Sequence, residues 1–474
     1  MTSQKPSQSR RQLFIYDQRR RSKVLFEPLN ERVTMYVCGM TVYDYCHIGH
    51  ARCMIFFDLV QTVLESAGYP TVYVRNITDI DDKIIARCQR DEASPKQLTQ
   101  RFIDAMWQDE AALGINQPTH QPRATEYVEQ MITWIERLLE AGYAYVGDNN
   151  DVYYRISKFE SYGCLSGRSV NQLVAGSRVD ADPFKEQPLD FVLWKQSKEN
   201  EPFWESPWGR GRPGWHLECT VMSQSLLGET IDIHGGGHDL CFPHHENEIA
   251  QAEPLTKKRF VNHWMHVGHV EIDREKMSKS KGNFFLIRDV LKQYTPSEVR
   301  FFMLMSHYRH PVNFSEDNWL SARNALSKIH RVCDDYLRSH RLVLDNGFIP
   351  QACWDAMLDD FNTPKVFAIL FEIIKLYDQA SHQQDSDLID QCGRQVVNIT
   401  EWLGLSVVSD IAVDATLVDS LIQKRSLARA SRDWQQADEI RERLSEMGIV
   451  IEDQSTGTIW RVDRRSARHD GESR

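Results

Sequence analysis

Several features that would indicate other classes of protein are missing from this 474-residue sequence. No apolar run reaches the ~18 residues that a membrane-spanning helix needs, and nothing near the N-terminus resembles a secretory signal. The ten cysteines include no C-x-x-C pair, which argues against a disulfide scaffold and for a reducing compartment. We therefore expect a soluble, cytoplasmic protein with no membrane partner, in which most cysteines are buried thiols.

A positive net charge is also lacking, because 67 acidic residues outnumber 56 lysines and arginines and give a net charge of -11. This excludes a protein that is basic overall, although an RNA partner needs only a local basic surface. Residues 1–23 are locally basic, with seven Lys or Arg and one acid, Asp17. This segment is predicted to be a basic arm beside nucleic acid or a disordered tail, with a strand-like pattern from Leu13.

The stretch from Met35 to His50 has the pattern of a nucleotide-binding unit. A short strand at 35–37 is followed by Cys38-Gly39, a polar loop, and His47-Ile48-Gly49-His50, which opens an amphipathic run that stops at Gly68. The N-terminus of a helix suits phosphate because its N–H groups are unpaired and its dipole end is positive. Two histidines at that point could contact a phosphate chain.

A second predicted strand, Thr71–Val74, completes a parallel, right-handed β-α-β crossover. It is followed by Asp79, Asp81 and Asp82, in a loop at the strand end where α/β sheets bind ligands. These acids could hold magnesium or a substrate amine. Capping the next helix is the commoner role for such residues, and we favour it for Asp81 and Asp82.

The length predicts about three domains. Between about 113 and 211 a helix (124–141) and a hairpin around Gly147–Asn150 indicate an insertion into a nucleotide-binding fold. The fold class is predicted to be α/β: a Rossmann-like parallel-sheet catalytic domain with an inserted α+β segment, then a helical bundle and a small mixed α/β C-terminal domain. The predicted boundaries are 1–23 for the arm, 24–315 for the catalytic domain (insertion 113–211, lysine loop 276–280), 316–405 for the bundle, 412–463 for the C-terminal domain and 464–474 for a flexible tail.

Two further motifs follow in the second half. A predicted strand, Ile231–His234, runs into Gly235-Gly236-Gly237 and then Asp239. Three glycines would let a flat ligand such as adenine approach the backbone, although such runs also form plain turns.

Pro243 should begin a helix on which His244 and Glu248, four residues apart, share one face. A metal needs that geometry, and a charged helix surface is the alternative.

Lysines are clustered in Lys276-Met277-Ser278-Lys279-Ser280, and Lys281 follows directly. Lysines on a loop of small residues can neutralise the charge that develops on a departing pyrophosphate. Solvated surface lysines are the ordinary alternative.

Together these segments resemble the cysteinyl-tRNA synthetase family, from about residue 13 to 463. The tetrapeptide at 47–50 and the lysine string at 276–280 resemble the two class I aminoacyl-tRNA synthetase signatures, in the expected order. The segments specific to the cysteine enzymes are 35–39, 215–219, 233–237 and 243–248. Lys281 departs from the family, whose members usually carry an apolar residue there.

The resemblance implies that cysteine and ATP form cysteinyl-adenylate and that cysteine is then transferred to the 3′ end of tRNA(Cys). One Zn²⁺ per subunit and Mg²⁺ with the ATP are the implied metals, and a monomer is expected by family analogy. The implied site residues are Cys38, Cys219, His244 and Glu248 for zinc; His47, His50, Lys276 and Lys279 for catalysis; His47, Gly49, His50, Gly235, Gly236, Asp239 and Lys279 for ATP; and Thr41, Trp215 and His234 for the amino acid.

Zinc would allow the site to distinguish cysteine from serine. Cysteine and serine differ by one atom, and an apolar pocket distinguishes such small differences by only ~1 to 3 kcal/mol. A thiol binds zinc as a thiolate, whereas a serine hydroxyl does not ionise readily. We therefore predict no editing domain. Trp215 would be a wall of this pocket or, alternatively, a core residue.

Beyond Phe314 the sequence becomes helical and resembles the family's tRNA-binding helical domain, and the last unit (422–460) resembles its anticodon-binding unit. Arg429, Asp438 and Asp453 are candidates for contacting anticodon bases, since Arg suits guanine and a carboxylate suits the amino group of cytosine. Ion pairing on a helix surface is the alternative.

Three other functions stay open at this point. One is the related ligase that transfers cysteine to an amino sugar in mycothiol synthesis, which does not need the C-terminal unit. Another is a catalytically silent RNA-binding paralogue, against which the intact signatures argue. The weakest is a zinc hydrolase built on His244, His245 and Glu248.

Overall fold

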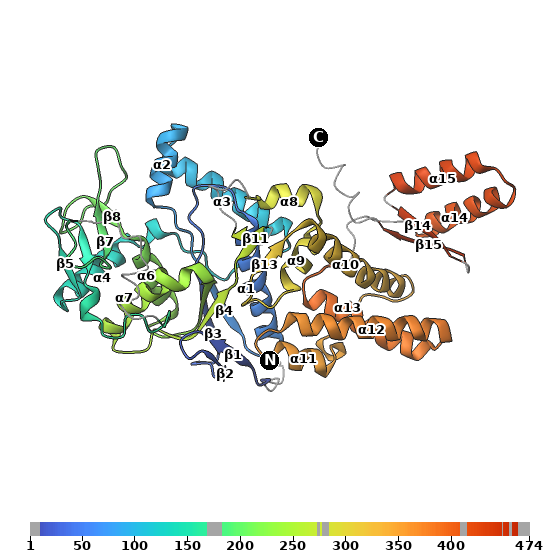
Figure 1. Cartoon of the computed structure of the whole chain (residues 1–474), viewed down its shortest axis with the longest axis horizontal. Helices are drawn as coiled ribbons and strands as arrows, with labels where there is room; N and C mark the ends of the chain where they lie inside the picture. The colour runs from blue at the N-terminus through green and yellow to red at the C-terminus, as the bar shows by residue number, and fades with distance from the viewer. Residues whose placement is uncertain are drawn as a thin grey trace, which may run out of the picture. The chain divides into compact units, whose positions relative to one another are not determined.

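The computed structural model describes residues 10–167, 183–272, 275–276, 284–407, 415–447, 449–454 and 457–462. Figure 1 shows its helices and strands. The chain divides into two compact units. Unit 1 is Met1–Arg288, Met303–Ser315 and Ala352–Val366, and unit 2 is Asp289–Phe302, Glu316–Gln351 and Phe367–Arg474. In the part of the chain that is described, no helix has the length and apolar character needed to cross a bilayer.

A parallel four-stranded sheet of order β10-β9-β3-β4 is the principal sheet of unit 1. Its strands are β3 (Val33–Val37), β4 (Thr71–Arg75), β9 (Ile231–Gly237) and β10 (Val261–Val267). Helix α1 (Ile48–Ser66) connects β3 to β4, which confirms the predicted β-α-β crossover. Most of these strand residues are buried, as expected for a parallel sheet covered by helices on both faces.

The loops after β3 and β4 touch one another because Gly39 has no side chain. A Cβ at this position would lie 1.6 Å from the carbonyl oxygen of Asn76. The Gly39 amide donates to Asn76 Oδ1 at 2.8 Å. This contact brings the residues that follow two neighbouring strands to one edge of the sheet.

The region predicted as an insertion contains an antiparallel sheet of order β5-β6-β7-β8. Its strands are β5 (Ala144–Val146), β6 (Val152–Tyr154), β7 (Phe191–Gln196) and β8 (Gly211–Pro213), and Figure 1 shows α4 (Val128–Glu140) beside them. The β5–β6 pair confirms the predicted hairpin. Large buried rings such as Tyr154 and Trp194 join this sheet to the core that contains Cys38 and Cys219.

The other elements of unit 1 surround the principal sheet or extend it. The N-terminal hairpin is β1 (Phe14–Asp17) and β2 (Ser22–Leu25), the helices are α2 (Asp82–Asp91), α3 (Pro95–Ala112), α6 (Trp215–Leu227), α7 (Glu246–Thr256) and α11 (Gln351–Met357), and a second sheet consists of β11 (Val270–Ile272), β12 (Glu275–Lys276) and β13 (Val312–Phe314). Asp81 caps α2 as predicted, with its carboxylate accepting from the Lys83 amide. Asp82 instead pairs with Lys195 and Arg212.

Two expectations need correction. The disordered-tail alternative is wrong for residues 14–23, because Leu13 and Ile15 are buried and anchor the β1–β2 hairpin. Gly235–Gly237 do not follow the strand but belong to β9, where they pair with β10.

The predicted start of a helix at Pro243 is confirmed. In the turn at 241–245 the backbone of Phe242 is extended, with φ -141° and ψ 131°, and helical geometry continues from Pro243 into α7.

Unit 2 is mainly helical, as predicted. Its elements are α9 (Pro296–Leu304, shared with unit 1), α10 (Glu316–Leu337), α12 (Thr363–Gln383, shared with unit 1), α13 (Ser386–Trp402), α14 (Ala415–Ala430), α15 (Trp434–Glu446), β14 (Ile449–Gln454) and β15 (Gly457–Val462), while α8 (Ile287–Gln293) also crosses the boundary with unit 1. The predicted final strand pair is confirmed, since β14 and β15 are antiparallel. Figure 1 shows α14 and α15 packed side by side next to this ribbon.

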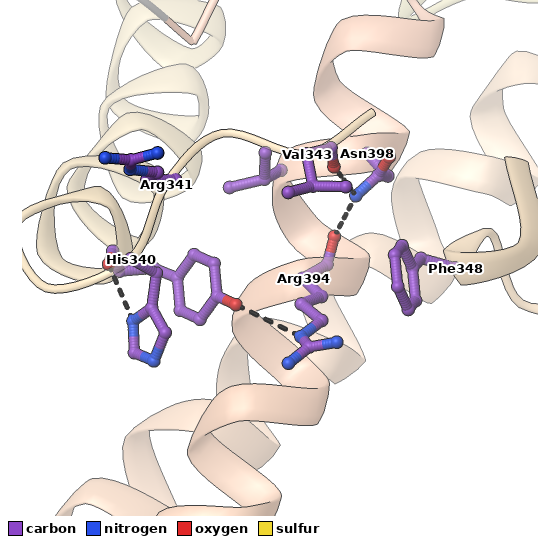
Figure 2. Close-up of a pocket in the computed structure, with 8 residues that line it drawn as sticks. His340, Arg341, Val343, Phe348, Arg394 and Asn398 are labelled. Carbon is purple, nitrogen blue, oxygen red and sulfur yellow. Dashed lines mark hydrogen bonds between the residues drawn. The ribbon is translucent and has the colours of Figure 1, made fainter. Parts of the chain in front are cut away.

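A cavity of about 230 Å³ lies between α10, the following loop and α13 in unit 2. Figure 2 shows how its polar groups are engaged. Asn398 Nδ2 donates to the carbonyls of Val343 and Arg394, and Arg394 Nε donates to Asp390 and Tyr336. These bonds attach the loop to α13, so the polar lining has a structural role.

Candidate active site and metal centre

The carboxyl ends of β3 and β9 face a cavity of about 420 Å³. The chain continues from β3 towards β4 on one side of the sheet, while β9 lies on the other side, so this is a topological switch point where α/β sheets bind ligands. The cavity is lined by seven residues that the sequence predicts for the site: Cys38, Thr41, His47, Gly49, His50, Trp215 and Asp239.

His47 and His50 form the N-terminal cap of α1. His47 Nδ1 accepts from the amides of Gly49 and His50, and His50 Nδ1 accepts from the His47 amide at 3.2 Å. The two rings are stacked with centroids 3.6 Å apart. Because each Nδ1 is an acceptor, the proton of each neutral ring is on Nε2. Both imidazoles can therefore donate a hydrogen bond to an anion beside the positive end of the helix dipole.

Cys38, Cys219, His244 and Glu248 come together deep beside this cavity. One donor atom from each lies within 4.8 Å of the others, and all four residues are buried. Cys38 Sγ is 3.6 Å from Cys219 Sγ and 3.5 Å from Glu248 Oε1, and His244 Nε2 is 3.2 Å from Glu248 Oε1. The loop after β3, helix α6, the turn at 241–245 and helix α7 each supply one donor.

A second donor set shares two of these residues. Cys38, His234, His245 and Glu248 also lie within 4.8 Å of one another. His245 Nε2 is 3.3 Å and His234 Nε2 is 3.4 Å from Cys38 Sγ. His245 was expected at a metal only in the hydrolase alternative, although its place next to His244 in a histidine pair was a visible signal.

Burial determines the protonation of these donors. It raises the pKa of Cys38 well above its usual range, with further increases from neighbouring Cys219 and Glu248. Burial likewise raises the pKa of Cys219 and, with the neighbouring His216 and His234, lowers the pKa of His244. Two thiols, an imidazole and a carboxylate are a donor set that suits zinc. They fit a cation because its charge would stabilise the thiolates that burial disfavours.

The neighbours of these donors fix their orientation. His244 Nδ1 lies 3.0 Å from His216 Nδ1, which leaves its Nε2 facing Glu248. His245 Nδ1 is similarly 2.8 Å from His266 Nε2. Such partners set the tautomer of a metal-binding histidine.

Of the residues predicted to bind the substrate amino acid, some line the cavity and one lies in the core. Trp215 is 39% exposed and its ring lies 4.5 Å from that of His244, so the core alternative is wrong. Thr41 also lines the cavity. His234 is fully buried below it, 3.4 Å from Glu248 Oε2, and could act as a metal donor as well as a pocket residue.

The two β9 glycines that were predicted to bind ATP pack against other protein atoms. A Cβ at Gly235 would lie 2.1 Å from the ring of Phe57, and one at Gly236 would lie 2.9 Å from Leu240. Gly237 and Asp239 line the cavity instead. Contact of ATP with Gly235 and Gly236 therefore stays a prediction.

The lysine signature falls largely beyond what the structure describes. Lys276 is the last residue of β12. Lys279 and Lys281 lie outside the described residues. Their expected actions on phosphate stay predictions.

The anticodon candidates lie in the small C-terminal part of unit 2. Asp453 accepts from both outer nitrogens of Arg425, at 2.8 and 2.9 Å, and from Arg429 at 2.5 Å. Arg429 and Asp453 thus form the kind of ion pair that the sequence left open as the alternative. Asp438, on α15, is the third candidate, and base contacts by all three stay predictions.

Comparison with known families gives three consecutive matches. Residues 25–324 match the tRNA synthetases class I (C) catalytic domain, residues 354–407 match the DALR domain, and residues 416–461 match the cysteinyl-tRNA ligase anticodon binding domain. The first match alone covers more than half of the chain. The cysteine–tRNA ligase of Pseudomonas fluorescens strain Pf0-1 is 49% identical over 465 residues, covering 95% of this chain and 99% of the relative. This chain belongs to the cysteine–tRNA ligase family.

Other relatives agree with this membership. The cysteine–tRNA ligase of Acinetobacter baumannii strain AYE is 47% identical over 94% of this chain and 98% of the relative. Among solved structures, the Agrobacterium radiobacter K84 agnB2 LeuRS-tRNA-LeuAMS ternary complex is similar with a TM-score of 0.58 at 11% identity, covering 80% of this chain and 84% of that chain. Mycobacterium tuberculosis methionyl-tRNA synthetase with methionyl-adenylate gives 0.56 at 13% identity, covering 79% and 90%. These structures confirm the predicted class I fold.

Proposed function

We propose that this protein is an ATP-dependent ligase that activates L-cysteine as cysteinyl-adenylate and transfers it to the 3′ end of tRNA(Cys). The observation that carries the proposal is the convergence of Cys38, Cys219, His244 and Glu248 beside the capping histidines of α1. A thiol-selective metal site next to a phosphate site fits the activation of cysteine better than any other reaction considered.

The four donors would hold one Zn²⁺, which would bind the thiolate of substrate cysteine and so exclude serine. His216 orients His244 for this role, and Trp215 covers the neighbouring wall of the cavity. Thr41 and His234 are the remaining residues assigned to the amino acid. Rejection of serine at the binding step makes an editing domain unnecessary.

The activation step needs positioning and charge stabilisation more than covalent chemistry. The carboxylate of cysteine attacks the α-phosphate of ATP and pyrophosphate leaves. His47 and His50 donate from Nε2 to the phosphate oxygens as negative charge builds there, and Lys276 and Lys279 act on the β and γ phosphates. Gly49, Gly235, Gly236 and Asp239 are assigned to ATP, which enters with Mg²⁺.

The second step delivers the cysteinyl group to a terminal ribose hydroxyl of tRNA. The match of residues 416–461 to an anticodon binding domain favours tRNA over an amino sugar as the acceptor. Arg429, Asp438 and Asp453 are assigned to anticodon bases. We further propose a cytoplasmic monomer.

Pyrophosphate exchange with cysteine and with serine tests this function, with bound zinc quantified in the same samples. Exchange should occur with cysteine alone and should decline in proportion to zinc as the metal is removed by a chelator. Cysteine-specific exchange in zinc-free protein would contradict thiolate recognition by zinc. Charging of tRNA(Cys), compared with transfer to an amino sugar, then identifies the acceptor.

A further inference from the structure

One edge of the 420 Å³ cavity has no part in the activation of cysteine described above. Tyr43, Asp44, Tyr45 and Lys83 line this edge. The metal donors and Trp215 occupy the side assigned to cysteine, while His47, His50 and Asp239 occupy the side assigned to ATP. The remaining edge belongs to the loop after β3 and to the first turn of α2.

Helix α2 presents a row of cations next to this edge. Lys83, Arg87 and Arg90 are spaced by four and three residues and therefore share one side of the helix. The apolar residues Ile84 and Ile85 are buried on the opposite side. On the side that carries the cations, Lys83 and Arg90 are exposed, whereas Arg87 packs over the ring of Phe102 at 5.3 Å.

Lys83 of this row, together with Arg101 of α3 and Arg288 of α8, lies over the two tyrosine rings of the loop. Lys83 Nζ is 5.5 Å from the ring centroid of Tyr43. The guanidinium groups of Arg288 and Arg101 are 4.0 and 5.7 Å from the ring centroid of Tyr45, and Arg101 Nη2 donates to the Tyr45 hydroxyl at 3.1 Å. Aromatic rings and positive charges are therefore interleaved along this edge of the cavity and beside it.

These cations differ in whether a salt bridge engages them. Arg87 pairs with Asp91 at 2.6 Å and with Asp44 at 3.5 Å. Lys83 and Arg101 are exposed, and within the described part of the chain neither has a carboxylate at salt-bridge distance. A phosphate backbone could therefore approach both side chains without breaking a salt bridge of the described residues, and the nearby Asp81 carboxylate interacts electrostatically with Lys83.

We propose that Tyr43, Tyr45, Lys83 and Arg101, here named the tyrosine–cation rim, bind the single-stranded 3′ end of tRNA while its last ribose enters the cavity. This proposal rests on the proposed function. Single strands are bound by cations that follow the phosphates and by aromatic rings on which bases stack, and the rim supplies both.

The double variant Lys83→Ala/Arg101→Ala tests the rim, because both side chains are exposed and the fold should tolerate their loss. We expect the KM for tRNA to rise about tenfold. The slope of log(kcat/KM) against log[salt] should become shallower by about 1.4, because each phosphate contact on a single strand contributes ~0.7. Pyrophosphate exchange, which needs no tRNA, should stay within about twofold of wild type. Lys83→Arg/Arg101→Lys keeps both charges and should retain the wild-type slope.

Arg137→Ala is the matched control, because Arg137 is also an exposed arginine over an aromatic ring, 4.8 Å from Trp134 on α4. It should leave the charging slope and exchange unchanged. A wild-type slope and KM in the double variant would contradict tRNA binding by the rim but not the proposed function. A fall in exchange that parallels the loss of charging would contradict it equally. If the wild-type protein does not charge tRNA while exchange is intact, the transfer step of the proposed function fails, and the rim's role with it.

Discussion

The donor cluster around Glu248 in unit 1 and the charged cluster around Asp453 in unit 2 differ in how far their charges are compensated. In unit 1 two thiols, an imidazole and a carboxylate are buried together without a cation among the described residues. In unit 2 the Asp453 carboxylate is bound by two arginines and by the Thr458 hydroxyl. The first cluster has the donors that could hold a cation, whereas the charges of the second are paired within the protein. An uncompensated buried cluster is therefore the stronger sign of a binding site.

Removing one donor from the unit 1 cluster should have the largest effect. Loss of residues that merely orient a metal ligand costs about 10–100-fold, so Cys219→Ala should lower zinc affinity and cysteine-dependent exchange by at least about 100-fold. Metal analysis and pyrophosphate exchange measure this. Cys392→Ala removes another buried thiol, in α13, and should leave the zinc content unchanged. Full zinc content in Cys219→Ala would place the metal elsewhere.

His47→Asn separates the phosphate contact from the helix cap. Asparagine is a good N-cap, so α1 should stay intact, but the Nε2–H donor is lost. We expect kcat for exchange to fall by about 10²–10³, the effect of removing one donor to a developing charge, with unchanged zinc content and melting temperature. His47→Ala should lose an additional ~1 kcal/mol of stability through the missing cap. Near-normal exchange in His47→Asn would remove His47 from the catalytic set.

The affinity of unit 1 for zinc should depend steeply on pH. Burial raises the pKa of Cys38 and of Cys219, so both thiols are protonated in the metal-free protein at neutral pH and must release protons to bind as thiolates. The pKa of His244 is lowered, so its ring is already neutral. Affinity should thus fall by up to about 100-fold for each pH unit of acidification. Chelator competition at pH 6, 7 and 8 measures this, and a pH-independent affinity would contradict the assigned ligands.

Asp453→Asn should have the smallest effect, because the carboxylate is partly exposed and such pairs contribute about 1 kcal/mol or less. The hydrogen bond from Arg425 lowers the pKa of Asp453. The stabilisation is therefore complete above the unfolded carboxyl pKa of ~3.9 and is lost as the pH falls further towards the folded value. Thermal melts at pH 7, 5 and 3 should show the same difference between variant and wild type at pH 7 and 5, and a reduced but still measurable difference at pH 3.

Asp438→Asn sharpens the same comparison. Asp438 forms no hydrogen bond or salt bridge among the described residues and interacts with Arg425 only through its charge, so the melting temperature of Asp438→Asn should change less than that of Asp453→Asn. A raised KM for tRNA in Asp438→Asn would then report a base contact and not a loss of stability. Equal KM values for both variants and wild type would leave the Asp453 cluster as a purely structural feature.

Much of the fold was predictable because it follows from local patterns. The period of the apolar residues and the glycine after α1 predicted the β-α-β crossover, and the turn residues at 147–150 predicted the β5–β6 hairpin. The spacing of His244 and Glu248 predicted their contact, and Pro243 predicted where helical geometry begins, directly after the extended Phe242.

The sequence by itself determined the strand and helix pattern and the family resemblance with the zinc ligands that it implied, because motifs and spacing are properties of the chain. Only the tertiary structure decided which side chains meet across that pattern. It placed His234 and His245 beside Cys38, packed Gly235 against Phe57, and paired Arg429 with Asp453. The physical reason is that such contacts join residues from separate elements, and their distances depend on how whole strands and helices pack.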